Sequence, residues 1–73
     1  MNVFRVFPIV CDAHGCALVV ARSTNEALRL VNEGNKTYSE NYISLGCQLM
    51  FDLRCESNEP YVIFDSIYIE KED

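Results

Sequence analysis

Residues 16–34, which read CALVVARSTNEALRLVNEG, decide the fold of this chain because they carry it from a strand directly into a helix. Cys16 to Ala21 is a short apolar run that ends at Arg22, as expected of a strand. Ser23 and Glu26 follow three residues apart, the spacing of a capping box, in which the side chain of each accepts a hydrogen bond from the backbone amide of the other. The sequence therefore predicts a strand that gives way to a helix at Ser23.

One face of this helix is apolar. Ala27, Leu30 and Val31 follow the i, i+3 and i+4 spacing of an amphipathic helix, and Leu28 is a further apolar neighbour. Gly34 can adopt the left-handed conformation that closes many helices. The pattern predicts a helix over residues 24–33 that packs its apolar face on a sheet.

A hairpin precedes the helix. Asn2 to Val10 is rich in Val, Ile and Phe, which predicts a first strand, and Pro8 marks an edge position, a bulge or the end of that strand. Residues 12–15, Asp-Ala-His-Gly, then supply turn chemistry before the strand from Cys16 to Ala21.

Two further strands are predicted after the helix. Gly34 to Tyr42 is polar and lacks periodicity, which indicates a loop. Apolar and polar residues then alternate between Ile43 and Cys55, the period of a half-buried strand. A turn at residues 57–60 leads into Tyr61 to Ile69, a β-branched and aromatic run.

The last predicted strand carries a possible bend at Asp65 and Ser66, and residues 70–73 form a charged tail that we expect to be frayed. The whole chain, residues 1–73, is expected to form a single domain. Its predicted class is α+β: a two-layer ββαββ sandwich, ferredoxin-like or related, with one helix on one face of a mostly antiparallel four-stranded sheet. Because the helix returns the chain parallel to the second strand, the third can pair antiparallel with the first, and we expect the order 2-1-3-4.

The segment from Leu18 to Ala27 resembles the strand-to-helix entry of small ferredoxin-like and ββαβ domains, several of them bacterial or phage proteins. The resemblance implies the architecture and selects no activity, because one fold hosts many functions.

The charge of the chain argues against nucleic-acid binding. The net charge is −5, and residues 52–73 hold seven acids against Arg54 and Lys71. A field of this sign repels phosphate backbones and favours basic partners. The longest apolar run near the N-terminus, Val6 to Cys11, is far shorter than the ~20 residues of a membrane span. We therefore expect a cytoplasmic protein without direct nucleic-acid or membrane partners.

The predicted sheet has more apolar residues than one helix can cover. On each predicted strand, one set of alternate residues is expected to face the helix: Phe4, Val6, Val10, Leu18, Val20, Leu49, Phe51, Leu53, Val62 and Phe64. The opposite parity is also largely apolar, and exposed apolar patches usually mark interaction surfaces. This predicts a homodimer through the uncovered face, with these partner-binding residues: Phe7, Ile9, Val19, Met50, Tyr61 and Ile63. Alternatively, the loop from Gly34 to Tyr42 or a twisted last strand covers that face internally.

A metal or thiol site is a second hypothesis. Cys11, His14 and Cys16 bring three possible ligands close in sequence, and Cys47 or Cys55 would provide the fourth that zinc requires. The spacing lacks the paired Cys-x-x-Cys pattern of a structural zinc site. Without a secretion signal, the cysteines are expected to be reduced thiols.

The leading interpretation is thus a non-enzymatic interaction or accessory module that needs no cofactor. The sequence contains no recognisable nucleophile with an oriented base, no glycine-rich phosphate loop and no telling pair of carboxylates. A third hypothesis is an acidic, phage-type inhibitor whose C-terminal third binds a basic partner.

Overall fold

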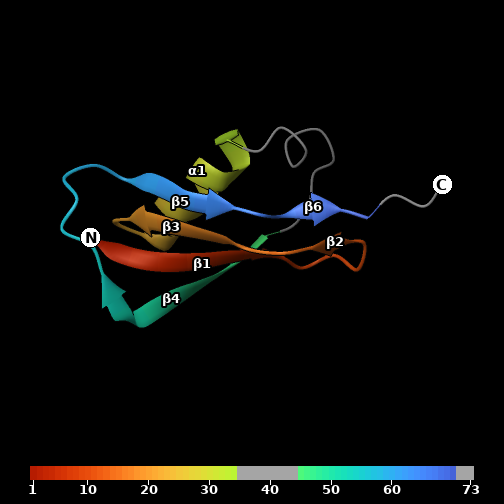
Figure 1. The fold of residues 1–73 in the computed structure, drawn as a ribbon, viewed down its shortest axis with the longest axis horizontal. Coiled ribbons are helices and arrows are strands. Elements are labelled where there is room, and N and C mark those ends of the chain that lie inside the picture. The colour runs from red at the N-terminus through yellow and green to blue at the C-terminus, as the bar shows by residue number, and fades with distance from the viewer. Residues whose placement is uncertain (35–44, 71–73) are drawn as a thin grey trace.

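The described part of the chain forms one helix and six strands (Figure 1). This computed structural model describes residues 1–34 and 45–70, and for residues 51 and 52 only the backbone. The elements in chain order are β1 (Asn2–Pro8), β2 (Ala13–His14), β3 (Ala17–Ala21), α1 (Thr24–Gly34), β4 (Leu45–Arg54), β5 (Tyr61–Asp65) and β6 (Tyr68–Ile69). The predicted α+β class, with one helix against a mostly antiparallel sheet, is confirmed. The loop predicted over residues 34–42 and the tail at 70–73 fall, apart from Gly34 and Glu70, outside the described residues.

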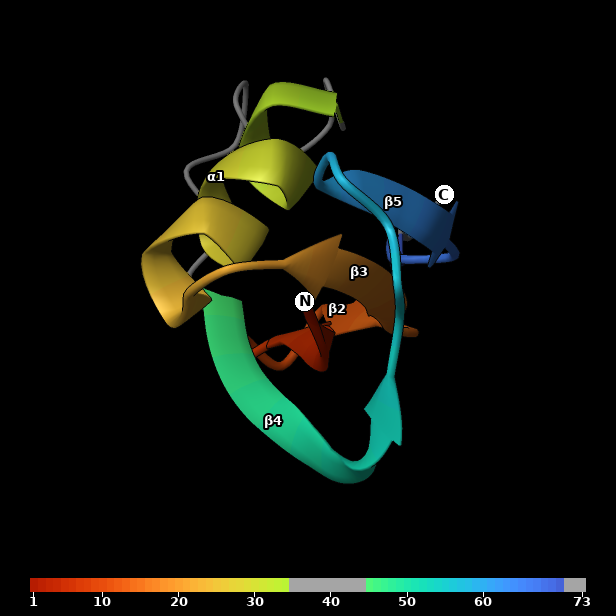
Figure 2. The ribbon, with the colours of Figure 1, turned by 90° about the vertical axis from the view of Figure 1, so that its left-hand side faces the viewer.

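Four strands form the main sheet in the order β4-β1-β3-β5, and every neighbouring pair is antiparallel. The predicted β1–β3 hairpin and the antiparallel pairing of β4 with β1 are confirmed. The predicted position of the last strand is wrong, because β5 pairs with β3 and not with β4. Consecutive strands β4 and β5 therefore occupy opposite edges, and their connection crosses the whole width of the sheet (Figure 2).

The helix begins at the predicted cap. The Ser23 hydroxyl accepts a hydrogen bond from the Glu26 amide at 3.2 Å, as a helix N-cap should. The reciprocal half of the capping box is displaced by one residue, since the Glu26 carboxylate accepts from the Arg22 amide at 2.8 Å. Gly34 is the last helical residue and does not have the positive φ predicted for it.

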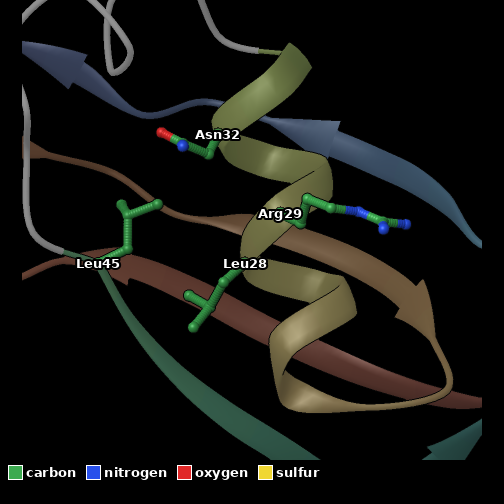
Figure 3. Close-up of a pocket in the computed structure, with 4 residues that line it drawn as sticks. All are labelled: Leu28, Arg29, Asn32 and Leu45. Atoms are coloured by element: carbon green, nitrogen blue, oxygen red, sulfur yellow. The ribbon is translucent and has the colours of Figure 1, made fainter.

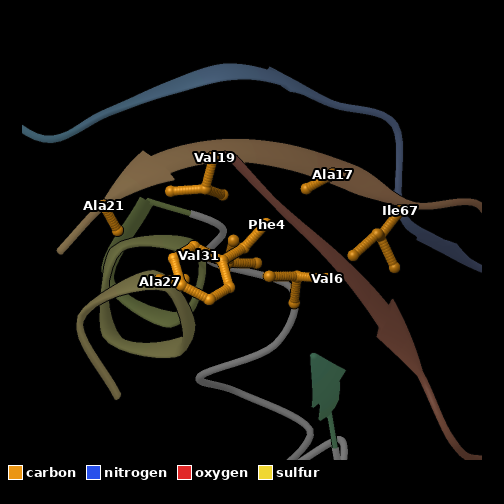
Figure 4. Close-up of a cluster of buried hydrophobic side chains, with 8 residues drawn as sticks. All are labelled: Phe4, Val6, Ala17, Val19, Ala21, Ala27, Val31 and Ile67. Atoms are coloured by element: carbon orange, nitrogen blue, oxygen red, sulfur yellow. The ribbon is translucent and has the colours of Figure 1, made fainter. Parts of the chain in front are cut away.

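The core lies between α1 and one face of the sheet (Figure 4). Its buried side chains are Phe4, Val6, Ala17, Val19, Ala21, Ala27, Val31 and Ile67. In the first strand, Phe4 and Val6 face the helix as predicted, whereas Val10 lies beyond the end of β1 and outside this cluster. The parity predicted for β3 is wrong. Val19 faces the helix, because it lies opposite Phe4 in the antiparallel register, while Leu18 and Val20 face the other way. Ala17 and Ala21 share the buried side of β3 with Val19.

Two irregularities shift the register of the outer strands. Between the pairs Asn2–Arg54 and Phe4–Leu49 the register of β4 changes by three residues. In β5, Val62 lies opposite Val19 and Phe64 opposite Leu18, so Ile63 is an extra residue, a β-bulge. Such bulges reverse the alternation of side chains along a strand.

A second, two-stranded ladder extends the hairpin beyond the main sheet. It pairs β2 with β6, which the sequence did not predict as separate strands, although the predicted bend at Asp65–Ser66 is confirmed by the break between β5 and β6. Gly15, at the base of this extension, has a φ of +92°. In residues 1–34 and 45–70, no helix combines the length and apolar composition that crossing a membrane requires.

Candidate interaction surface

The sheet face opposite the helix, called here the back face, carries the side chains of alternate residues on each strand. On this face, Val3 and Arg5 of β1 lie beside Val20 and Leu18 of β3, respectively. Phe7 of β1 lies beside Gly46 of β4. This face was predicted to be uncovered. The structure divides it into a covered half and an exposed half.

The covered half lies at the start of β1. Val3 and Val20 are 5% and 0% exposed although the helix packs on the other face. Figure 2 shows β4 curling under the sheet and the β4–β5 connection passing over this end of the back face. The Met1 amino group donates to the Cys55 carbonyl at 2.9 Å, and the Cys55 amide donates to the Met1 carbonyl at 3.1 Å. The prediction of a fully uncovered face is therefore wrong at this end.

Phe7 is engaged within its own chain. Its ring lies on Gly46 of the neighbouring strand, so closely that a Cβ on that glycine would stand 2.7 Å from the ring Cζ. The guanidinium of Arg5 lies over the same ring at 5.0 Å from its centroid, a cation–π arrangement. Phe7 is half-buried by these contacts, which reduces the apolar area that it offers to a partner.

The exposed half lies along β5. Six large apolar side chains in the described residues are exposed, and three of them, Tyr61, Ile63 and Phe64, stand on this five-residue strand. Tyr61 lies opposite Val20 and Phe64 opposite Leu18, so both aromatic rings share the back face. Residues three apart normally point to opposite faces of a sheet, and the bulge at Ile63 is what brings these two together.

Phe64 is the surface residue that the sequence analysis missed. It was assigned to the core by simple alternation, but the bulge moves it to the back face, where its side chain is 44% exposed. The only signal in the sequence was the density of apolar residues in Tyr-Val-Ile-Phe, which leaves no polar residue to mark an outer face. Leu53, also assigned to the core, is likewise exposed, and Phe51 lies outside the described side chains.

The six predicted partner-binding residues divide three ways. Tyr61 and Ile63 are exposed together on β5, and Ile9 is exposed beyond the end of β1. Phe7 and Met50 are half-buried. Val19 is fully buried beneath the helix, so its assignment to a partner surface is wrong.

Acidic groups flank the β5 surface. Glu59 and Glu70 are exposed before and after it, and the Asp65 carboxylate at its end accepts a hydrogen bond from the Ile67 amide at 3.0 Å. The Tyr61 hydroxyl lies 3.4 Å from the Cys55 sulfur, and this hydrogen bond, with the charge of the thiolate and some desolvation, raises the pKa of Tyr61 above its usual 10.0.

The proposed metal ligands do not converge. His14 Nε2 lies 3.0 Å from a Glu70 carboxylate oxygen and its ring stacks at 5.6 Å from Tyr68. Cys11 is exposed and Cys16 half-buried, and within residues 1–34 and 45–70 no three His, Cys, Asp or Glu side chains form a group that could hold a metal. All four cysteines are free thiols. Burial raises the pKa of Cys47, partly offset by a hydrogen bond from Thr24, which disfavours its reactive thiolate.

Two surface pockets lie among the described residues, and neither holds a recognisable set of catalytic groups. One, of about 370 Å³, lies between α1 and β4 and is lined by Leu28, Arg29, Asn32 and Leu45 (Figure 3). It is wide open, and Arg29 lies 3.8 Å from Glu33. The other, of about 520 Å³, lies beside the Met1–Cys55 contact. Neither combines a nucleophile with an oriented base, so the β5 surface is the stronger candidate.

The chain matches no protein-family model, no curated protein and no solved structure.

Proposed function

We propose that this chain is a small, non-enzymatic interaction module of the cytoplasm that self-associates through the exposed half of its back face. The observation that carries the proposal is the concentration of apolar exposure on β5, which bears Tyr61, Ile63 and Phe64. Contiguous exposed apolar side chains on a small domain usually mark an interaction surface. Self-association would bury this surface and add to a core that is small because the chain is short.

The proposal is tested by the mass of the chain in solution. Sedimentation should give a mass that rises above 8.4 kDa toward twice that value as the concentration increases from about 10 μM to about 1 mM. Phe64→Ser should hold the protein at the monomer mass, because it removes an aromatic side chain from the proposed contact. Tyr68→Ser is the matched control, since Tyr68 is also aromatic and exposed but lies on β6, which pairs with β2 outside the main sheet.

A wild-type mass of 8.4 kDa at every concentration would refute self-association. Equal effects of the two substitutions would refute the assignment to β5. The acidic residues beside β5 support a second candidate, a basic protein partner. A monomeric chain that binds basic polypeptides, with affinity lost on adding salt, would favour that candidate.

A further inference from the structure

The sheet has two outer strands, and they differ in how they are protected. Outer strands present backbone donors and acceptors that pair with any suitable strand, and proteins guard them with Lys, Pro or short length. Along its ten residues, β4 bends through a three-residue register shift, and among the side chains that the structure describes on it one large apolar residue, Leu53, is exposed. Within its five residues, β5 exposes three, and it contains no Lys, Arg or Pro. Although β5 is short and bulged, its described side chains make it the more apolar of the two edges.

The bulge gives this edge a particular side-chain pattern. Tyr61 and Phe64 share the back face, because their partners in β3, Val20 and Leu18, are two residues apart. Consider two copies of β5 related by a two-fold axis that passes between Val62 and Ile63. Tyr61 of each chain then lies opposite Phe64 of the other, and directly opposed residues of antiparallel strands share a face. Moving the axis onto Ile63 would oppose Val62, which faces the helix, to Phe64, which faces away from it, and moving it onto Val62 would oppose Phe64 to Pro60, which precedes the strand.

We propose that two copies of the chain pair β5 against β5 in antiparallel orientation, with Tyr61 of one opposite Phe64 of the other. This inference rests on the proposed self-association and specifies its geometry. The two sheets join into one of eight strands, twice the four of a single chain, with both helices on the same side. A second copy fits this edge because an antiparallel two-fold pairing needs only one kind of strand, and here it also matches aromatic to aromatic on one face.

The exposed area indicates that the dimer is weak. Tyr61 and Phe64 each expose a little under half of their surface, out of the ~150–250 Å² that an aromatic side chain can bury. Even with Ile63 and the backbone, the interface falls below the ~1,200 Å² of stable complexes. The flanking acids also repel, since this register brings Glu59 of one chain toward Asp65 of the other. We therefore expect a dissociation constant above about 10 μM.

Backbone pairing is tested by amide hydrogen exchange, followed by NMR at low and high concentration. Amides of β5 should exchange about tenfold more slowly once roughly nine-tenths of the chain is dimeric, because exchange then proceeds through the remaining monomer. Amides of β4, the other outer strand, should be unchanged. Unchanged β5 amides in a sample that sedimentation shows to be dimeric would overturn the edge pairing and leave self-association standing.

A matched pair of substitutions tests the edge independently. Ile63→Lys places on β5 the charge that guards natural edges, while Ile9→Lys makes the same change at an exposed isoleucine outside β5. Ile63→Lys should raise the dissociation constant at least about tenfold even though it lowers the net negative charge, and Ile9→Lys should not. Equal effects would overturn the inference, and circular dichroism checks that both variants fold.

The register is tested by photo-oxidative tyrosine cross-linking. Phe64→Tyr keeps an aromatic ring and places a second phenol opposite Tyr61 of the other chain. This variant should gain a dityrosine-linked dimer over the wild type, and adding Tyr61→Phe should remove the gain. A gain that survives Tyr61→Phe would overturn the register. A wild-type chain that sediments as a monomer at every concentration would overturn the proposed function itself.

Discussion

Gly15 holds a backbone conformation that other residues adopt only at a cost. Its φ is +92°, and a Cβ there would collide with the backbone carbonyl of Ser66. The Ser66 amide donates to the Cys16 carbonyl at 3.0 Å at the same place, so the two segments are held close together. Gly15 thereby lets the β2–β6 ladder continue from the main sheet.

We predict that Gly15→Ala lowers the free energy of unfolding by about 1–3 kcal/mol, the usual cost of a strained backbone position. Gly34→Ala is the control, because its φ is not positive and nothing lies within 4 Å of the added methyl group. That variant should be stabilised by about 0.5–1 kcal/mol, since alanine favours helix. Urea denaturation measures both, and a similar change in the two variants would contradict the role assigned to Gly15.

The Cys47 thiol should respond to pH in a defined direction. Burial raises its pKa above 9.0 in the folded chain, with partial opposition from the Thr24 hydrogen bond. The unfolded thiol therefore loses its proton first as the pH rises, so the contribution of this group to stability declines above about pH 9. At pH 8, iodoacetamide should modify exposed Cys11 well before Cys47, as mass spectrometry would show. Equal rates would contradict the burial effect.

At the scale of elements, the N-terminal cap of α1 can be tested directly. The Ser23 hydroxyl accepts from the Glu26 amide at 3.2 Å, and its backbone carbonyl accepts from the Ala27 amide at 3.0 Å. Ser23→Ala should lower the free energy of unfolding by about 1 kcal/mol, the typical value of a lost cap. Asn25→Ala, at an exposed position of the first turn, should change it by less than about 0.5 kcal/mol. Thermal or urea unfolding distinguishes the two.

The elements themselves could be predicted from the sequence because each carries a local signal. Ser23 and Glu26 predict the start of the helix, and the alternation between Ile43 and Cys55 predicts the strand that the structure shows as β4. The face of β3 could not be predicted, because both of its parities are apolar and a strand of that kind does not specify which side is buried. The buried side of β3 carries Ala17, Val19 and Ala21, whereas the prediction placed the larger Leu18 inside.

The exposed apolar surface of β5 could be predicted only in part, for a related reason. Tyr61 and Ile63 are exposed on the strand for which the sequence predicts an uncovered face, but the exposure of Phe64 depends on a bulge. One extra residue reverses every later side chain of a strand, and its position is fixed by pairing with β3, which is a tertiary contact. The burial of Val20 likewise depends on the path of the distant β4–β5 connection.

For the molecule as a whole, the net charge of −5 predicts how the proposed dimer responds to salt. Two acidic copies repel each other, and salt screens that repulsion over a length that shrinks from about 10 Å at 0.1 M to about 3 Å at 1 M. The dissociation constant should therefore fall severalfold as sodium chloride is raised across this range, as sedimentation would show. A dimer that weakens with salt would contradict an interface in which like charges face each other.

In the main sheet, β4, β1 and β3 lie side by side. The outer edge of β3 is paired with β5, which comes later in the chain than the other three strands. During synthesis, β1 and β3 can pair early because they are close in the chain, whereas β5 can pair with β3 only after β4 has been made and placed at the opposite edge.

Substitutions in β5 should then act mainly on the rate of unfolding, and those in the β1–β3 hairpin on the rate of folding, as a chevron analysis would reveal. A nascent chain would thus pass through a stage in which the outer edge of β3 is unpaired. A second nascent chain, made on a neighbouring ribosome, could pair with that edge before the first chain adds its own β5.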